Sequence, residues 1–202
     1  MTTTSARTMA AGLRYHEPHM KAQAFFAQAM RVVLTLWGAL TFSNVLLGVL
    51  TVVVPARMPP PKDLTQVAIL GALAVGVVIA SFVVPARMQL QMARQARAEV
   101  AEPEPMPGGM RGPARFAQPE KAARAAMGLA LTPFIMSMAL SEAVSLLGLV
   151  VHMQGAAMTI STPFIVAGTL LAAIRFPTVA RMVGPFERAH GATFAASTGP
   201  SY

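Results

Sequence analysis

The chain has 202 residues, of which 54% are hydrophobic and only 12% are charged, and its formal net charge is +8. Soluble domains carry about 25% charged residues, so this composition excludes an ordinary soluble domain, and its high apolar content excludes a disordered chain. Because cysteine is absent, disulfides, thiol nucleophiles and thiolate metal sites are also excluded. The composition predicts an integral membrane protein.

Four apolar stretches approach or reach the roughly 20 residues that a membrane-spanning helix needs. In chain order they cover residues 32–54, 64–84, 125–151 and 158–174. The fold class predicted from them is all-α: a polytopic membrane protein whose four transmembrane helices form two similar helical hairpins.

The basic residues predict the orientation. All but two of the 16, Arg57 and Lys62, lie in the N-terminal arm, in the central connection or in the C-terminal part of the chain. Basic residues gather on the cytoplasmic side of membrane proteins, so we expect a multi-pass protein with cytoplasmic N- and C-termini. Topology and anionic lipid explain these charges, and the lipid bilayer is therefore an expected partner while nucleic acid is not.

The predicted segments follow from these spans. Residues 1–31 form a cytoplasmic arm, whose Phe25 and Phe26 beside Lys21 indicate either an interfacial helix or an extension of the first span. The other segments are a first hairpin (32–88), a cytoplasmic Pro/Gly-rich loop with helical flanks (89–124), a second hairpin (125–182) and a flexible cytoplasmic tail (183–202).

The two predicted hairpins resemble each other in sequence. A shift of 100 residues places residues 39–48 on residues 139–148 with five of ten positions identical, and a shift of 94 places Phe82 on Phe176. The change between the two shifts falls in the short outer connections, where insertions are tolerated. We interpret the pattern as a duplication that produced parallel repeats.

Glu142 is the one acidic residue inside a predicted span, and the 100-residue shift aligns it with Phe42. A charged carboxylate there is costly, and desolvation favours the neutral acid, so we expect Glu142 to be mostly protonated. The spans contain no Lys or Arg to pair with it. Its expected polar neighbours are Ser141, Ser145, Thr41, Ser43 and Asn44, whereas His152 is expected at the outer membrane interface.

The helix around Glu142 also resembles a known family. Residues 138–151 are similar to the ion-binding helix of the rotary ATP synthase c subunit (proteolipid), and Gln118-Pro119 resembles the polar loop of that family. The duplicated halves with one acid resemble the doubled proteolipids of V-type ATPases. By this resemblance Glu142 carries a proton or cation, and Gln118-Pro119 meets the stalk.

The sequence also departs from the c-subunit pattern. Ala117 and Phe116 stand where the loop arginine is expected, and Pro133 interrupts the helix. The whole chain is more similar to uncharacterised bacterial four-helix membrane proteins with c-like helices, in which one helix ends in a motif matched here by residues 176–178, Phe-Pro-Thr. This resemblance implies a bacterial inner (cytoplasmic) membrane.

The sequence shows no motif of a catalytic or metal site. It contains no Gly-rich phosphate loop, paired carboxylates or Ser/His/Asp set, and the four histidines are scattered. We therefore expect no catalytic residues, no cofactor and no metal. The predicted function is that of a non-enzymatic membrane protein that self-associates or serves as an accessory subunit of a membrane assembly. The alternative is an ion-translocating proteolipid that binds a proton or cation at Glu142.

Overall fold

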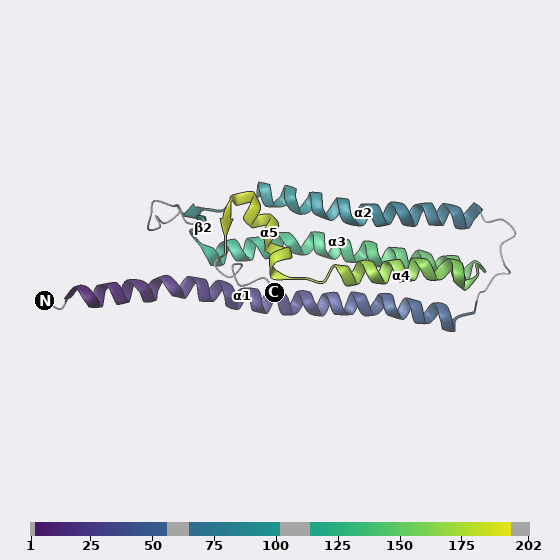
Figure 1. Ribbon diagram of the computed structural model, residues 1–202, viewed down its shortest axis with the longest axis horizontal. Coiled ribbons are helices and arrows are strands. Elements are labelled where there is room, and N and C mark those ends of the chain that lie inside the picture. The colour runs from purple at the N-terminus through teal and green to yellow at the C-terminus, as the bar shows by residue number, and fades with distance from the viewer. Residues whose placement is uncertain (1–2, 56–64, 102–113, 195–202) are drawn as a thin grey trace. The chain divides into compact units, whose positions relative to one another are not determined.

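The computed structural model describes residues 3–55, 65–101 and 114–194, with side-chain surroundings from residue 21 onward. The described residues form five helices and three very short strands (Figure 1). In chain order the elements are α1 (Thr3–Val53), α2 (Thr65–Gln95), β1 (Val100–Ala101), β2 (Ala114–Phe116), α3 (Pro119–Met153), α4 (Met158–Ile174), α5 (Val179–His190) and β3 (Ala192–Thr193).

The prediction of an all-helical membrane protein is confirmed in its coarse form. Three helices, α1, α2 and α3, are long and apolar enough to cross a membrane. The number rises to four if α4 and α5, which are separated by a break of no more than four residues, together form one span. The segment predicted as the fourth span coincides with α4 at both ends.

One prediction about a helix break is corrected: Pro133 lies inside α3 and does not interrupt it, and Pro85 and Pro163 lie inside α2 and α4. A proline removes one backbone donor, and spanning helices tolerate this loss when neighbouring groups satisfy the freed carbonyl. Helix α1 runs without interruption from Thr3 to Val53, as in the alternative in which the N-terminal arm extends the first span.

The prediction of a flexible tail over residues 183–202 is wrong for residues 183–194, and residues 195–202 lie outside the described part. Helix α5 is amphipathic: Met182, Val183 and Phe186 are buried, while Arg181 and Arg188 are exposed. Its N-cap, Thr178, accepts a hydrogen bond from the backbone of Arg181. The burial of three apolar side chains orders this segment.

The described chain divides into two compact units. We call residues 33–88 and 132–177 the apolar unit, and residues 1–32, 89–131 and 178–202 the charged unit. Each long helix contributes to both, because the division falls within α1, α2 and α3.

Within the apolar unit, the helices meet along constant registers. Contacts between α1 and α3 keep a nearly constant separation of 98–101 residues, so these two helices run parallel (Figure 1). Helix α4 runs antiparallel to α3, because Gly148 of α3 meets Ser161 while Ser141, farther back along α3, meets Gly168. Helix α3 is the most buried of the three long helices: 44% of its most apolar window is buried, compared with 11% for α1 and for α2.

The charged unit has an aromatic core beside a small sheet. Strand β2 pairs antiparallel with β1 and parallel with β3. The ring of Phe116 lies 4.5 Å from Phe194 and 5.5 Å from Phe186, and Phe194 contacts Phe26 edge-on at 5.2 Å. Helix α2 ends at Gln95 and α3 begins at Pro119, and short strands lie in the adjoining stretches. The helical flanks predicted for the central loop are thus shorter than expected. Residues 102–113 of that loop lie outside the described part.

Candidate functional site

Glu142 lies on α3 in the apolar unit and is half-buried. The hydroxyl of Ser43, on α1, donates a hydrogen bond to Glu142 Oε1 at 2.5 Å. This distance is at the short end of the range for bonds between two oxygen atoms. The structure thus brings together the predicted acid and one of its three predicted partners on α1.

A second polar pair joins the same two helices. The Ser145 hydroxyl donates to Asn44 Oδ1 at 2.6 Å, and Asn44 Nδ2 donates to the Leu40 carbonyl at 3.0 Å. Both Ser145 and Asn44 are fully buried. The Ser145 hydroxyl is therefore used in binding Asn44. Thr41, the third candidate on α1, has a buried hydroxyl without a hydrogen-bond partner.

Ser141 belongs to a different cluster, on the side of α3 that faces α4. Its hydroxyl donates to the Ser137 carbonyl at 2.9 Å and accepts a hydrogen bond from Arg175 Nη1. Arg175 immediately follows α4, and only 8% of it is exposed. Ser141, which immediately precedes Glu142 in the chain, thus binds this buried cation.

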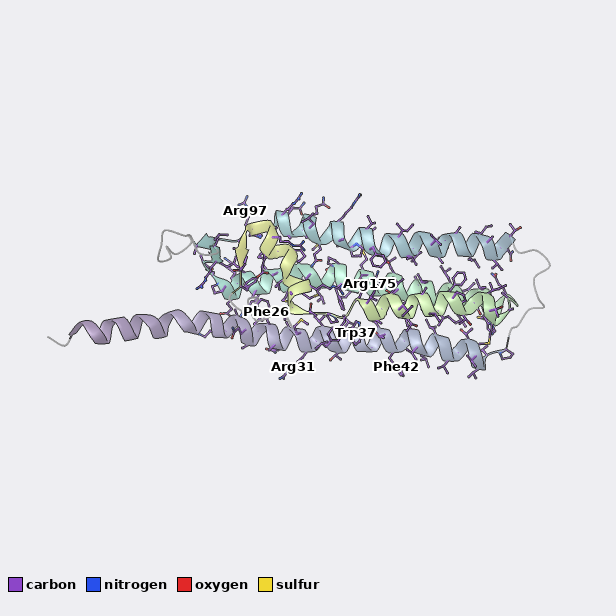
Figure 2. All side chains as sticks on the ribbon, viewed as in Figure 1. Phe26, Arg31, Trp37, Phe42, Arg97 and Arg175 are labelled. Atoms are coloured by element: carbon purple, nitrogen blue, oxygen red, sulfur yellow. The ribbon has the colours of Figure 1, made fainter. Side chains whose placement is uncertain are left out.

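Arg175, at the end of α4, binds both of the helices α2 and α3. Nη1 also donates to the Ser137 carbonyl at 2.9 Å, and Nη2 donates to the carbonyl and hydroxyl of Ser81 at 3.0 and 2.7 Å. The guanidinium lies 5.0 Å from the ring centre of Phe82, a cation–π distance. Figure 2 shows Arg175 among the helices.

Sequence reasoning missed this cluster because Arg175 follows the last apolar residue of its span. A side chain at the end of a helix tilts back toward the N-terminus, so an arginine placed just outside a span can reach into it. The available signal was the line of serines at four-residue spacing, Ser137, Ser141 and Ser145, which marks one face of α3 as polar.

An aromatic contact lies beside Arg175. The Trp37 indole donates to the Ala172 carbonyl at 2.9 Å, and its ring meets Phe176 edge-on at 5.0 Å. Phe42, by contrast, lies on the outer side of α1 and is 67% exposed (Figure 2). The position that aligns with Glu142 in the first half of the chain is therefore occupied by a ring on the outer surface of the apolar unit.

The predicted polar-loop residues lie in the charged unit. Gln118 Nε2 donates to Glu99 Oε2 at 3.2 Å, and Pro119 is the first residue of α3. Gln118 lines a pocket of about 330 Å³ together with Arg97 and Lys121. These are solvated polar side chains at the start of a helix.

A carboxyl with one hydroxyl donor can take up and release a proton. Within the described ranges, no group of three His, Asp or Glu side chains is gathered in a way that could hold a metal ion.

Comparison of the chain with protein-family models, with curated proteins and with solved structures gives no match.

Proposed function

We propose that the chain is a four-span inner-membrane protein made of two similar hairpins, with both termini and the charged unit in the cytoplasm. The apolar helices and the placement of basic residues support this proposal. Contacts between the halves support the duplication. Residues that bond between α1 and α3 are 98–101 positions apart in the sequence. Residues of α2, or just after it, bond to residues of α5 or just after α4 that are 93–94 positions apart from them in the sequence. These values agree with the sequence shifts of 100 and 94, as expected for parallel repeats related by an axis along the membrane normal.

Its proposed role is non-enzymatic: it self-associates or serves as an accessory subunit of a membrane assembly, and Glu142 binds a proton reversibly. The observation that carries this role is the Ser43–Glu142 hydrogen bond between α1 and α3 in the apolar unit. A polar group between spanning helices can act as interhelical glue. A carboxyl at such a position can also change its charge, and a change there alters the attraction between the two helices.

The second candidate is an ion-translocating proteolipid, in which Glu142 carries a proton around a ring of subunits. Partial exposure of Glu142 on the apolar unit favours it, because a rotor carboxyl has to exchange its proton at a subunit surface. Oligomeric size separates the two candidates: a ring of many copies supports the proteolipid, and a monomer or dimer supports the accessory role.

A hydrophobic carbodiimide tests the proton site, because it modifies protonated carboxyls that it reaches from the lipid. We expect Glu142 to react in membranes at neutral pH and the Glu142→Gln variant to lose that label. Glu120→Gln is a matched control on the same helix, since Glu120 is solvent-exposed and paired with Arg124 at 2.6 Å. Labelling that is the same in wild type and Glu142→Gln would contradict the proposed site.

A further inference from the structure

His152 is a buried titratable residue at the end of α3, in the apolar unit, and only 8% of it is exposed. Its Nε2 lies 3.0 Å from the carbonyl oxygen of Val54, at the end of α1. A carbonyl can only accept a hydrogen bond, so Nε2 carries the hydrogen when the ring is neutral, and Nδ1 has the free electron pair. The sequence predicted an interfacial residue, whereas the structure places this side chain inside.

The other ring nitrogen is open to a proton. Among the residues that the structure describes, His152 Nδ1 is one of three buried side-chain polar atoms without a hydrogen-bond partner, and the amide oxygen of Gln154 is another. Such atoms are rare in folded proteins and call for an explanation. The Val54 carbonyl occupies Nε2, so Nδ1 is the ring atom that can bind a further proton.

His152 lies on the same side of α3 as Glu142. Glu142, Ser145 and His152 follow at intervals of three and seven residues, and each contacts α1. Their spacing in a helix corresponds to about 15 Å between Glu142 and His152. We call these residues and their side-chain partners on α1 the polar seam; its members are Ser43 and Asn44 on α1 with Glu142, Ser145 and His152 on α3.

We propose that His152 is a second proton-binding residue, which exchanges protons with Glu142 through the polar seam and with water at the outer end of α3. This inference rests on the proposed proton site at Glu142. The proton leaves the Glu142 carboxyl, passes along water molecules hydrogen-bonded to the seam, and binds to Nδ1. The other ring hydrogen stays on Nε2, which continues to donate it to the Val54 carbonyl. The carboxyl becomes a carboxylate and the imidazole becomes an imidazolium, and Nδ1 then releases its proton to the outer water.

The groups around His152 are consistent with such a role. Helix α1 presents the Val54 carbonyl, and Gln154 follows on the chain of α3 itself. The charged residues Arg57, Lys62 and Asp63 belong to the connection after α1 and lie outside the described part. Neither Val54 nor Gln154 supplies a competing charge.

Deuterium exchange of the Glu142 carboxyl tests the relay. The full chain in lipid bilayers is transferred to D₂O, and the infrared shift of the protonated-carboxyl band, assigned by its loss in Glu142→Gln, gives the exchange rate. We expect His152→Gln to slow this exchange at least tenfold, because glutamine can still donate to Val54 but cannot bind a proton. His190→Gln is the matched control and should exchange at the wild-type rate, since His190 contacts the carbonyls of Phe186 and Ala96 in the charged unit.

The outcomes separate the two proposals. A band that exchanges equally fast in His152→Gln and wild type overturns the relay and leaves the Glu142 site intact, whereas a missing band in wild type overturns both. A second measurement needs no variant. Val151–His152 is the only Val-His pair in the chain, so carbonyl-labelled valine with nitrogen-labelled histidine selects the His152 signal in NMR spectra. We expect hydrogen on Nε2 alone at high pH and on both nitrogens after acidification; hydrogen on Nδ1 alone at high pH would overturn the proposal.

Discussion

At the scale of single residues, two ionisable residues of the apolar unit, Glu142 and Arg175, have different surroundings. Glu142 is half-buried and bonded to one hydroxyl, whereas Arg175 is buried and bonded to serine hydroxyls and carbonyls of α2 and α3. Carbonyl and hydroxyl acceptors satisfy the guanidinium N–H groups without removing its charge. Arg175 is therefore suited to holding helices together.

Removal of Arg175 tests its role in stability. Hydrogen bonds between helices in membranes contribute about 0.6 kcal/mol each on average, so the loss of four bonds in Arg175→Met should lower the free energy of unfolding by about 2 kcal/mol. Denaturant unfolding in mixed micelles measures this free energy of unfolding. Arg87→Met is the control, because it removes an equal charge from an exposed position at the end of the apolar part of α2. Equal stability losses in both variants would contradict this role.

At the scale of helices, α3 is central because its polar residues contact both α1 and α4. Glu142 and Ser145 bond to α1, and Ser141 and Ser145 lie against Gly168 of α4. The contact with α4 is close: a Cβ atom added to Gly168 would lie 2.7 Å from the Ser141 carbonyl oxygen and 2.9 Å from the Ser145 nitrogen. Small residues allow such an approach between spanning helices.

Substitution of Gly168 tests this packing. In Gly168→Ala the added methyl group meets backbone atoms that cannot rotate away, so the helices have to separate, and we expect a loss of about 1–3 kcal/mol. Thermal unfolding followed by circular dichroism in detergent would show it. In Gly76→Ala of α2 the added atom has nothing within 4 Å, so stability should stay the same or rise. A Gly168→Ala variant as stable as Gly76→Ala would show that α3 and α4 are not closely packed.

At the scale of the whole molecule, charge and apolar surface are separated along the chain. The apolar unit leaves large aliphatic side chains exposed on α1 and α2, among them Val52, Val53 and Ile69, each more than 60% exposed. In water such a surface would be costly, whereas in a bilayer it faces lipid. The charged unit contains the sheet and the aromatic core, an arrangement that is compatible with exposure to water.

The orientation can be measured, because the chain contains no cysteine. A cysteine at exposed Ala157, in the turn between α3 and α4, should react with a membrane-impermeant maleimide in intact cells. A cysteine at exposed Arg97, in the charged unit, should react only after the membrane is permeabilised. Reaction in the reverse pattern would contradict the proposed cytoplasmic termini.

The sequence by itself determined the fold class and the positions of the apolar helices, because both depend on local composition. It also singled out Glu142, since one acid among apolar residues is visible without a structure. Parts of the fold that depend on distant contacts were not predictable in this way. The ordered structure of residues 183–194 depends on the burial of Phe186 and Phe194 in the core of the charged unit.

The tertiary structure alone decided which of several polar residues pair. Sequence spacing left Thr41, Ser43 and Asn44 equivalent as partners of Glu142, and the rotation of α1 against α3 selected Ser43. The same applies to Arg175, whose place in the sequence is outside a span but whose side chain extends back among the helices. These outcomes depend on the rotation and tilt of the helices relative to one another. Side-chain packing determines that geometry only once all the helices are assembled.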